Sequence, residues 1–393
     1  MVNSTRYAKA LRAALTRARE AAVAAIKKIV LSLFLAAALE ASALAATSLD
    51  LVFNYLSQGG KGGKQVYDGN GDQDLTIYEP VLYVNHEIDS KTAVFGSVVY
   101  DLLSSASNTA FDTGTGASKG GWQDRKAVNA GYSKRAGDWI YTPTLGFSTE
   151  LSYKSLSGGL NVQRFFAEEN FVLSAGIFHY ADQAKPWDIS AGAFRKWQDK
   201  TTDSANLSVT QLLSERDMVL AGVSYTAQNG YLEGTRNTVD TGTRVEEVLP
   251  GYREKYTLSG RYVRSLRENL ALHLDYRYYT DSWDIKSHTL EPALAVSFAE
   301  DKGLYRVFYR FYSQSEAEYY QDSFLSGART YMTSDSDLDK FSANEIGVQF
   351  TYAPERWEGM MGGDWTWGGT ALYYDRSNDL DAVIMQLSLG VKF

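Results

Sequence analysis

The sequence predicts an all-β protein, a transmembrane antiparallel up-and-down β-barrel of about 16 strands. Three observations lead to this prediction. The last thirteen residues alternate apolar and polar side chains and end in an aromatic residue. Segments of strand length recur along the chain and are joined alternately by short turns and long polar loops. The mean hydropathy is negative although 44% of the residues are hydrophobic, because lipid-facing and lumen-facing residues that alternate along a strand cancel in any average.

Residues 1–45 are predicted to be a basic leader and a secretory signal peptide, which leaves 46–393 for the barrel. Lys27 and Lys28 precede an apolar run, and Ala43-Leu44-Ala45 has the small-x-small pattern of a cleavage site. The long stretch before Lys27 is interpreted as an extended leader or a start-site error. Without residues 1–45 the chain has a net charge of −13, which argues against nucleic-acid binding.

The mature chain divides into sixteen strand-like segments separated by compact turns, such as Ala136-Gly137-Asp138 and Arg267-Glu268-Asn269, and by longer polar loops. Short periplasmic turns and long outer loops are typical of outer-membrane barrels. An even number of strands places both termini in the periplasm. The predicted strands lie near 48–58, 74–88, 92–104, 126–134, 139–152, 154–167, 171–181, 203–214, 218–229, 255–266, 270–279, 288–299, 304–317, 342–353, 364–376 and 381–393.

The 27 tyrosines suit the two membrane–water boundaries of such a barrel, where an apolar ring and a polar tip are both favourable. A Tyr-rich soluble sandwich is the alternative. After the leader no apolar run reaches the roughly 20 residues that a membrane-spanning helix needs. Pro80, Pro143 and Pro292 lie inside predicted strands, and since proline removes a hydrogen bond from the ladder, we expect bulges or local bends there.

The strand 381–393 resembles the closing strand of a Gram-negative outer-membrane barrel. Successive side chains of a strand point to opposite faces. We therefore expect Ser388 to face the lumen, and the resemblance implies that Phe393 is the signal read by the barrel-assembly machinery. The lipid-facing set is Val383, Met385, Leu387, Leu389, Val391 and Phe393.

The same alternation predicts a charged wall inside the barrel. Leucines and aromatic residues take the lipid face of the strands around 270–279, 288–299 and 304–317. The lumen then receives His273, Asp275, Arg277, Glu291, Arg306 and Arg310. Counting from the strand ends puts Arg277, Glu291 and Arg310 at similar heights, where opposite charges on neighbouring strands can pair. The wall is interpreted either as a structural ion-pair ladder or as a surface that contacts and selects solutes.

Two acidic loops are candidates for calcium. Asp68, Asn70, Asp72, Asp74 and Glu79 supply oxygen atoms at positions 1, 3, 5, 7 and 12 of a calcium-loop pattern. Gln73 stands where that loop needs its glycine, and Glu79 falls inside a predicted strand, so a solvated acidic turn is the alternative. The second loop contains Asp335, Asp337 and Asp339. No other cofactor is expected.

Catalysis is not expected. Cysteine is absent, so thiol chemistry and thiolate metal sites are excluded. An outer-membrane hydrolase needs a nucleophile or a water molecule beside a base and an orienting group. The four histidines, His86, His179, His273 and His288, are spread along the chain without such a motif.

Four segments resemble a bacterial outer-membrane family of unknown function. They are DLLSSAS (101–107), YRYYTDSWDIKSHTLE (276–291), FYRFYSQSEAEYY (308–320) and YMTSDSDLDKF (331–341). The resemblance covers most of the mature chain and implies a barrel in the outer membrane, but it carries over no catalytic residue. Genes for covalent flavin attachment are associated with such proteins, which suggests a redox pathway.

Two functions remain open from the sequence. The first is a channel for a small solute, because barrels of 16–18 strands leave a water-filled lumen unless they are plugged. The second is a non-conducting docking or scaffold barrel for a periplasmic redox or export partner. A loop folded inward, such as 105–125 or 231–254, favours the second. In both cases the barrel is expected to contact outer-membrane lipid and lipopolysaccharide.

Overall fold

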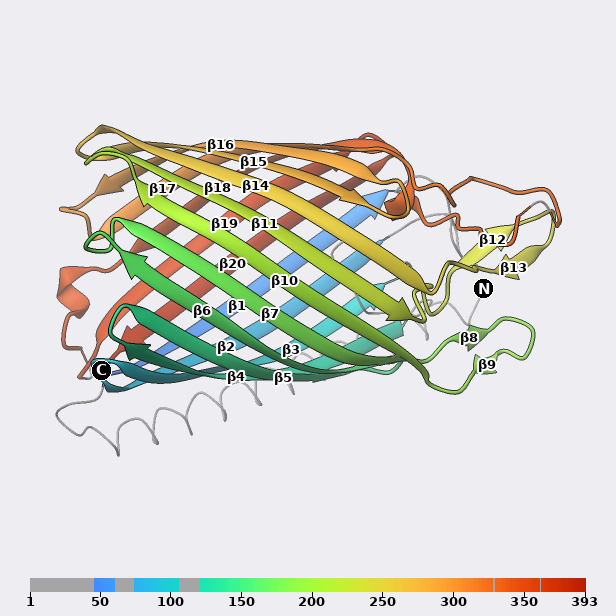
Figure 1. Ribbon diagram of the computed structural model, residues 1–393, viewed down its shortest axis with the longest axis horizontal. Helices are drawn as coiled ribbons and strands as arrows, with labels where there is room; N and C mark the ends of the chain where they lie inside the picture. The colour runs from blue at the N-terminus through green and yellow to red at the C-terminus, as the bar shows by residue number, and fades with distance from the viewer. Residues whose placement is uncertain (1–45, 61–73, 106–120, 328, 361) are drawn as a thin grey trace, which may run out of the picture.

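Sixteen antiparallel strands form a closed barrel in the computed structural model, which describes residues 46–60, 74–105, 121–327, 329–360 and 362–393 (Figure 1). Each barrel strand pairs with the barrel strands that come before and after it in the sequence, and β1 pairs with β20 to close the barrel. The barrel strands are β1 (Thr47–Gly60), β2 (Leu75–Asp89), β3 (Thr92–Ser105), β4 (Gly121–Ala136), β5 (Trp139–Thr149), β6 (Tyr153–Phe166), β7 (Phe171–Ala184), β10 (Gln198–Leu212), β11 (Asp217–Gly230), β14 (Tyr252–Arg267), β15 (Leu270–Asp281), β16 (Lys286–Phe298), β17 (Gly303–Gln314), β18 (Phe341–Tyr352), β19 (Asp364–Arg376) and β20 (Leu380–Lys392).

The predicted fold class and strand number are confirmed. The largest differences are in β10, which begins at Gln198 instead of 203, and in β4, which begins at Gly121 and is longer than the predicted segment 126–134. Its early part was hard to recognise because Gln123, Asp124 and Arg125 interrupt the apolar pattern. No helix in the described ranges is long and apolar enough to cross a membrane.

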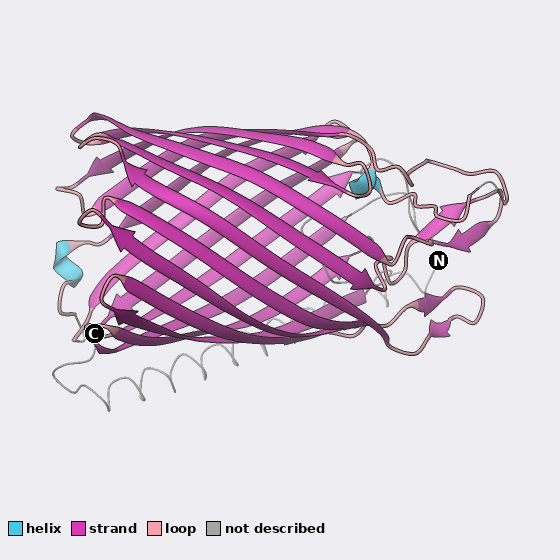
Figure 2. Cartoon of the chain, viewed as in Figure 1, coloured by secondary structure: helices cyan, strands magenta, loops and turns pink. Residues whose placement is uncertain are grey.

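The two ends of the barrel differ. The short turns lie at one end of the barrel. The beginning of β1 and the end of β20 lie there as well, where Phe393 N donates to Thr47 O at 2.9 Å. The long loops lie at the other end and carry two small hairpins, β8 (Trp187–Asp188) with β9 (Ala193–Phe194), and β12 (Thr238–Asp240) with β13 (Arg244–Glu246). Figure 2 shows the short helices η1 (Ser336–Leu338) and η2 (Glu355–Trp357) at opposite ends. This asymmetry is the one expected of periplasmic turns and outer loops.

Alternation gives the barrel an apolar outer face. Leu387 is 62% exposed on β20, whereas its neighbour Ser388 faces inward and is only partly exposed. Val391 and Phe393 share the outer face but are covered by Trp357 and Trp365 at the seam between β1 and β20. Large exposed side chains on the same face of other strands include Leu145, Phe147, Leu156, Ile177, Leu207, Val223, Leu258, Leu274, Leu290, Leu294, Val307, Ile346 and Val348. The apolar outer face predicted for β20 is therefore present, with its last two members covered.

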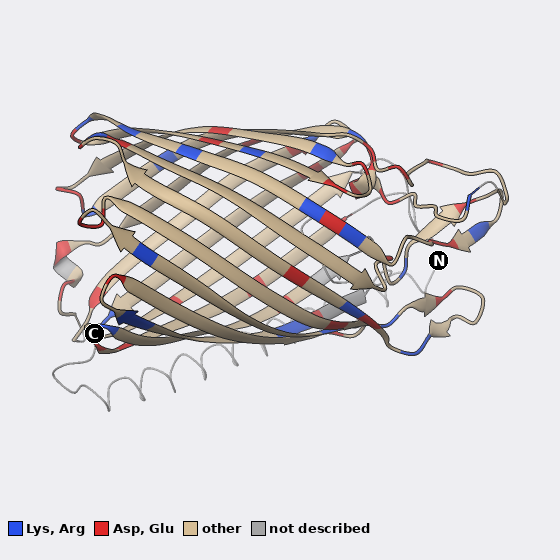
Figure 3. Cartoon of the chain, viewed as in Figure 1, with Lys and Arg blue, Asp and Glu red and all other residues tan. Residues whose placement is uncertain are grey.

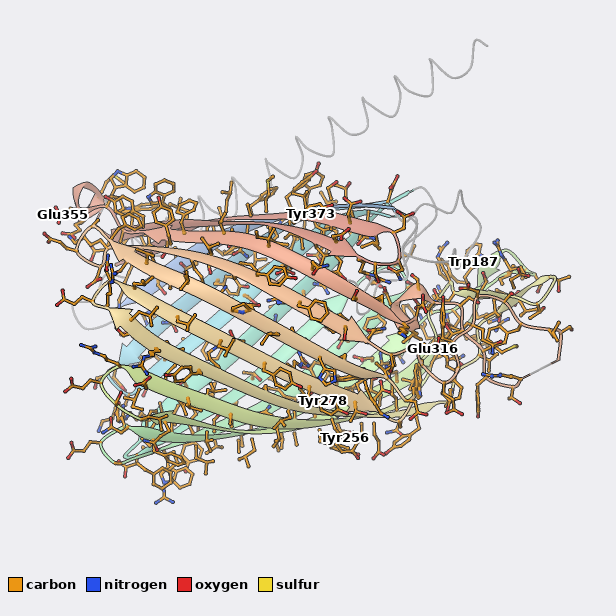
Figure 4. All side chains as sticks on the ribbon, turned by 90° about the horizontal axis from the view of Figure 1, so that it is seen from above. Trp187, Tyr256, Tyr278, Glu316, Glu355 and Tyr373 are labelled. Atoms are coloured by element: carbon orange, nitrogen blue, oxygen red, sulfur yellow. The ribbon has the colours of Figure 1, made fainter. Side chains whose placement is uncertain are left out.

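Aromatic side chains form belts near both ends of this apolar surface. At the turn end, a chain of ring contacts joins neighbouring strands: Phe298–Tyr305, Tyr305–Phe350, Phe350–Trp367 and Trp357–Trp367. Toward the loop end the contacts are Tyr55–Tyr78, Tyr225–Tyr256 and Tyr278–His288. Tyr256 and Tyr278 can be seen on the barrel in Figure 4, with Glu355 at the turn end and Glu316 at the loop end. Such belts are typical of the two interfaces of a membrane.

The expectation of bulges at the three prolines is wrong. Ladder pairs are missing beside Pro80 between Tyr78 and Val81, and beside Pro292 between Leu290 and Ala293, yet the register continues unchanged on both sides. Pro143 has the same effect on the pairing of β4 with β5. Each proline lacks the N–H that would bond one neighbouring strand, so one ladder opens locally while the other strand neighbour holds the alignment. The register shifts lie elsewhere, at 87–89 and 265–267.

The outer loops 231–251 and 315–340 pack against each other and form what we call the loop cap. Its first apolar cluster contains Leu249, Trp283, Ile285, Ala317 and Tyr320, and its second contains Val239, Phe324 and Met332. Backbone hydrogen bonds between Val248 and Met332 join the two loops. β12 and β13 lie beyond the ends of the barrel strands (Figure 1), so this part of the loop 231–251 is not folded into the lumen. Most of the loop 105–125 lies outside the described residues.

Candidate functional site

Two sets of ion pairs lie on the inner wall from β14 to β18, and together we call them the charged wall. Arg261 on β14 donates to Asp275 on β15 at 2.5 Å. Glu291 on β16 lies between Arg306 and Arg310 of β17 and accepts from Arg310 Nε at 2.6 Å. Arg310 also donates to Glu345 on β18 at 2.9 Å. Figure 3 shows how charged segments recur along these strands.

Both carboxylates at the centre of the charged wall are covered. The side chains of Glu291 and Glu345 are 8% and 6% exposed, whereas that of Arg310 is 41% exposed. The acids therefore lie against the barrel wall, and the guanidinium groups form the surface that meets the lumen. An arginine held by two carboxylates keeps a fixed orientation and can still present N–H groups to a passing solute.

Glu291 and Arg310 lie at similar heights and pair, as predicted, whereas Arg277 lies two residues away from its predicted height. Arg277 lies opposite Thr289, and Glu291 lies opposite Asp275. The connection 282–285 sets this register, because the Asp281 carboxylate accepts from the backbone N–H groups of Trp283 and Ile285 and closes a tight turn. Counting from estimated strand ends missed the alignment by two residues. Arg277 faces the lumen, is exposed, and makes no ion pair with any described residue.

Phe308 lies between the two arginines of β17 and supports them. Its ring is 6% exposed and lies 4.8 Å from the Arg306 guanidinium and 6.0 Å from that of Arg310. The ring occupies the space across from Gly347 on β18, where a Cβ atom would come within 2.3 Å of Phe308 Cζ. Glycine is therefore required there for the ring to lie flat beneath the arginines.

A second polar network crosses the seam where the barrel closes. Gln386 on β20 donates to Asn54 on β1 at 2.8 Å, and Asn54 donates to Glu79 on β2 at 2.7 Å. Arg125 on β4 continues the network through Asp101 on β3 at 2.5 Å and lies 3.8 Å from Glu79. These five strands are thus connected on the lumen side by side chains as well as by the ladder. The network is partly buried and suits a structural role at the closure.

The remaining arc, from β5 to β11, is lined mainly by hydroxyl and amide groups. Asn161 donates to Ser174 at 3.2 Å, and Ser204 shares a hydrogen bond of 2.7 Å with Thr226. Charged residues on the inward face of this arc are confined to Asp182 and Lys200, near the outer ends of β7 and β10. The lumen therefore has the charged wall from β14 to β18, the seam network with Glu79, Asp101 and Arg125, and a largely neutral polar arc from β5 to β11.

The four histidines do not form a common site. His273 faces the lumen on β15, as predicted. His179 and His288 lie on the outer face, beside Asp203 at 2.7 Å and Tyr276 at 2.8 Å. His86 contacts Thr47 near the turn end. No two of them share a pocket with a nucleophile in the described ranges.

The calcium hypotheses have different outcomes. Asp68, Asn70 and Asp72 lie outside the described residues, while Asp74 is exposed just before β2 and Glu79 belongs to the seam network. Asp335 caps η1 by accepting from Asp337 N, Asp337 pairs with Arg376 at 2.6 Å, and Asp339 accepts from Lys340 N. No group of three potential ligands converges within the described ranges.

A buried Glu247 and a partly buried Asp335 join the two loops of the loop cap. Glu247 accepts from Thr333 Oγ1 at 2.5 Å and Gly234 N at 2.8 Å, and Asn237 donates to both Glu247 and Asp335. Burial, and then the charge of Asp335, raises the pKa of Glu247 to about 8. Burial, and then the charge of Asp337, raises the pKa of Asp335 to about 7. These carboxyl groups thus change charge near neutral pH.

Sequence reasoning missed Arg261, Glu345, Lys200, Lys255 and the seam network. The signal for Glu345 and Arg261 was present, because Ile346 and Leu258 mark the lipid faces of their strands and alternation sends Glu345 and Arg261 inward. Their pairing with Arg310 and Asp275 could not be read in this way, since it depends on the register between strands.

The chain belongs to the family described as "Protein of unknown function (DUF3570)", whose model matches residues 104–389. No curated protein matches the chain. Among solved structures it is similar to a bacterial polysaccharide outer membrane secretin, with 11% identity and a TM-score of 0.47 over 89% of this chain and 98% of that chain. It is also similar to Pseudomonas aeruginosa OccK1 (OpdK), with 9% identity and a TM-score of 0.44 over 89% and 99% of the two chains. It is likewise similar to Acinetobacter baumannii OccAB1, with 12% identity and a TM-score of 0.41 over 89% of this chain and 97% of that chain.

Proposed function

We propose that this member of a family of unknown function forms a water-filled channel in the cell outer membrane, through which a small solute passes. The charged wall is the surface that this solute meets. The apolar outer face with an aromatic belt near each end supports the membrane location, with lipid and lipopolysaccharide around the barrel. No chemical step is assigned to the protein.

One observation carries the proposal: inward-facing side chains of the closed barrel are exposed to solvent. On the charged wall, the side chains of Arg261 and Arg310 are 48% and 41% exposed. On the opposite side of the barrel, Tyr83 faces inward on β2 and is 47% exposed. A packed or plugged interior would cover these groups. Barrels of 16–18 strands have room for such an aqueous lumen.

The direct test is electrical. Purified protein should form discrete conductance steps in planar lipid bilayers, and the steps should disappear after heat denaturation. Cell fractionation should recover the protein with the outer membrane in a heat-modifiable form. Deleting residues 238–246, which form β12, β13 and the turn between them, serves as a control because it leaves every barrel strand intact.

Absence of conductance from correctly folded protein would contradict the channel. The docking or scaffold barrel for a periplasmic redox or export partner would then be the better proposal. In that case the charged wall would brace the barrel, and a periplasmic partner should be recovered with it by crosslinking at the turn end. The barrel-assembly machinery is a partner under either proposal, and Phe393 is the residue proposed to be recognised.

A further inference from the structure

We infer that the solute is an anion with a carboxylate or phosphate group, drawn inward by three lumenal cations, Lys200, Lys255 and Arg277. This inference rests on the proposed channel and adds the charge class of its substrate. It follows from the balance of charge on one part of the lumen. That balance is opposite in sign to the charge of the chain as a whole, which is −8.

The inward face from β10 to β18 carries an excess of positive charge. The strand registers place seven cations and four carboxylates there. The cations are Lys200, Arg253, Lys255, Arg261, Arg277, Arg306 and Arg310, and the carboxylates are Asp275, Asp281, Glu291 and Glu345. Seven cations against four carboxylates leave an excess of three within these strands. Asp182 of β7, which lies opposite Lys200 at the edge of this face, adds a fifth carboxylate and reduces the excess to two.

Every one of the four carboxylates is already bound by an arginine. Asp275 is held by Arg261, and Glu291 and Glu345 are held by the arginines of β17. Asp281 is paired with Arg253, accepts from Tyr279 Oη at 2.6 Å, and closes the 282–285 turn with its other oxygen. Since its side chain is 0% exposed, Asp281 is not available as a counter-ion for a second cation in the lumen.

The cations left over are Lys200, Lys255 and Arg277. None of them lies within 4.0 Å of a carboxylate oxygen of any described residue. Lys200 instead lies 5.7 Å from the ring of Tyr153. Its cross-strand neighbour Asp182 accepts from Tyr153 Oη at 2.6 Å. The two lysines lie on opposite sides of β11, where Thr226 and Gln228 add a hydroxyl and an amide between them.

These three cations continue into the charged wall in the order in which a solute would meet them. Lys200 and Lys255 are close to the outer ends of β10 and β14, whose charged outer part can be seen in Figure 3. Arg277 is farther inside on β15, and Arg310 follows on β17. Unpaired cations in a narrow, low-dielectric passage attract anions and exclude cations. Guanidinium and ammonium groups are also the usual ligands of carboxylates and phosphates.

The test compares selectivity in two matched triple variants. The lumenal variant is Lys200→Gln, Lys255→Gln and Arg277→Gln. The control variant, Lys126→Gln, Lys154→Gln and Arg164→Gln, removes the same charge from exposed positions on the outer face. The readout is the reversal potential across a potassium chloride gradient, after heat-modifiable gel mobility has shown that each protein is folded.

We expect the wild type and the control to prefer chloride, and the lumenal variant to lose most of this preference. Suppose that the electrostatic potential in the lumen falls by one kT per unit charge. The anion concentration in the lumen then falls about 2.7-fold and the cation concentration rises about 2.7-fold, so the ratio of anion to cation permeability falls about sevenfold. In a liposome-swelling assay, gluconate or glucose 6-phosphate should enter faster than glucose, and glucosamine should enter slowest. Faster entry of only one of the two anions would identify the recognised group as carboxylate or phosphate.

A conducting wild type that prefers potassium, or that admits glucosamine as fast as gluconate, would overturn the inference while leaving the channel intact. Equal loss of selectivity in both triple variants would also overturn it, since the effect would then come from total charge. A folded wild type without conductance would contradict the proposed channel itself.

Discussion

Replacing Glu291 with lysine should destabilise the barrel and increase its preference for anions. Glu291 is the carboxylate shared by Arg306 and Arg310, and its side chain is 8% exposed. The substitution leaves Arg306 without any carboxylate partner among the described residues and adds a third cation beside it. Arg310 keeps Glu345. The new lysine would thus lie against two cations in a partly enclosed position.

The size of the loss follows from the exposure of the groups. Removing one member of a buried ion pair typically costs about 3–5 kcal/mol because the other charge stays buried and unpaired. Here the Arg310 side chain is 41% exposed to the lumen and that of Arg306 is 18% exposed, so water can solvate part of the stranded charge. We therefore expect a loss of about 2–3 kcal/mol, at or just below the lower limit of that range.

Two measurements check this prediction on the same protein. Denaturant unfolding in lipid, followed by tryptophan fluorescence, gives the free energy of unfolding, and the reversal potential gives selectivity. The control is Glu355→Lys, which makes the same charge change at an exposed position in the turn that follows β18. A conducting Glu291→Lys variant with unchanged selectivity would show that the charged wall only braces the barrel. Unchanged stability would show that the ion pairs of Glu291 contribute nothing.

Three further predictions concern other parts of the molecule. Deleting Phe393, which packs at the seam with Trp365 and Val391, should leave unfolded protein in the periplasm; normal outer-membrane levels would refute its role as the assembly signal. Arginine at lipid-facing Leu387 should cost about 2–4 kcal/mol near the bilayer midplane and arginine at Ser388 much less, so equal unfolding energies would refute the assignment of faces. In the folded protein the pKa values of Glu247 and Asp335 are about 8 and about 7, above the ordinary values of 4.5 and 3.8. The protonated acids therefore stabilise the loop cap. This stabilisation is fully present below about pH 4 and is lost as pH rises through 7 to 8. After correction for the intrinsic pH dependence of amide exchange, the exchange rate at 231–251 should therefore rise by about tenfold or more between pH 6 and 8.5, since the free energy of one pKa unit corresponds to a factor of ten. The substitution Glu247→Gln should remove most of this rise.

The barrel, the number of strands and the two faces of β15, β16, β17 and β20 follow from the sequence alone. These features depend on local information, since side chains alternate with a period of two and each short turn separates two such runs. For the same reason, the alternation of apolar and polar residues was enough to assign Glu291, Arg306 and Arg310 to the lumen. The outward faces of Leu274, Leu387 and their neighbours were predicted by the same rule.

Which charges meet depends on the tertiary structure. Register between neighbouring strands is set by cross-strand hydrogen bonds and by turns such as the one closed by Asp281, and a shift of two residues keeps every face but changes every partner. Arg277 was expected beside Glu291 for this reason and instead lies opposite Thr289. The loop cap was equally inaccessible, because Glu247 and Asp335 are far apart in the sequence and meet only when two loops pack on each other. The surplus of Lys200, Lys255 and Arg277 appears only after every carboxylate of the wall has been assigned its arginine.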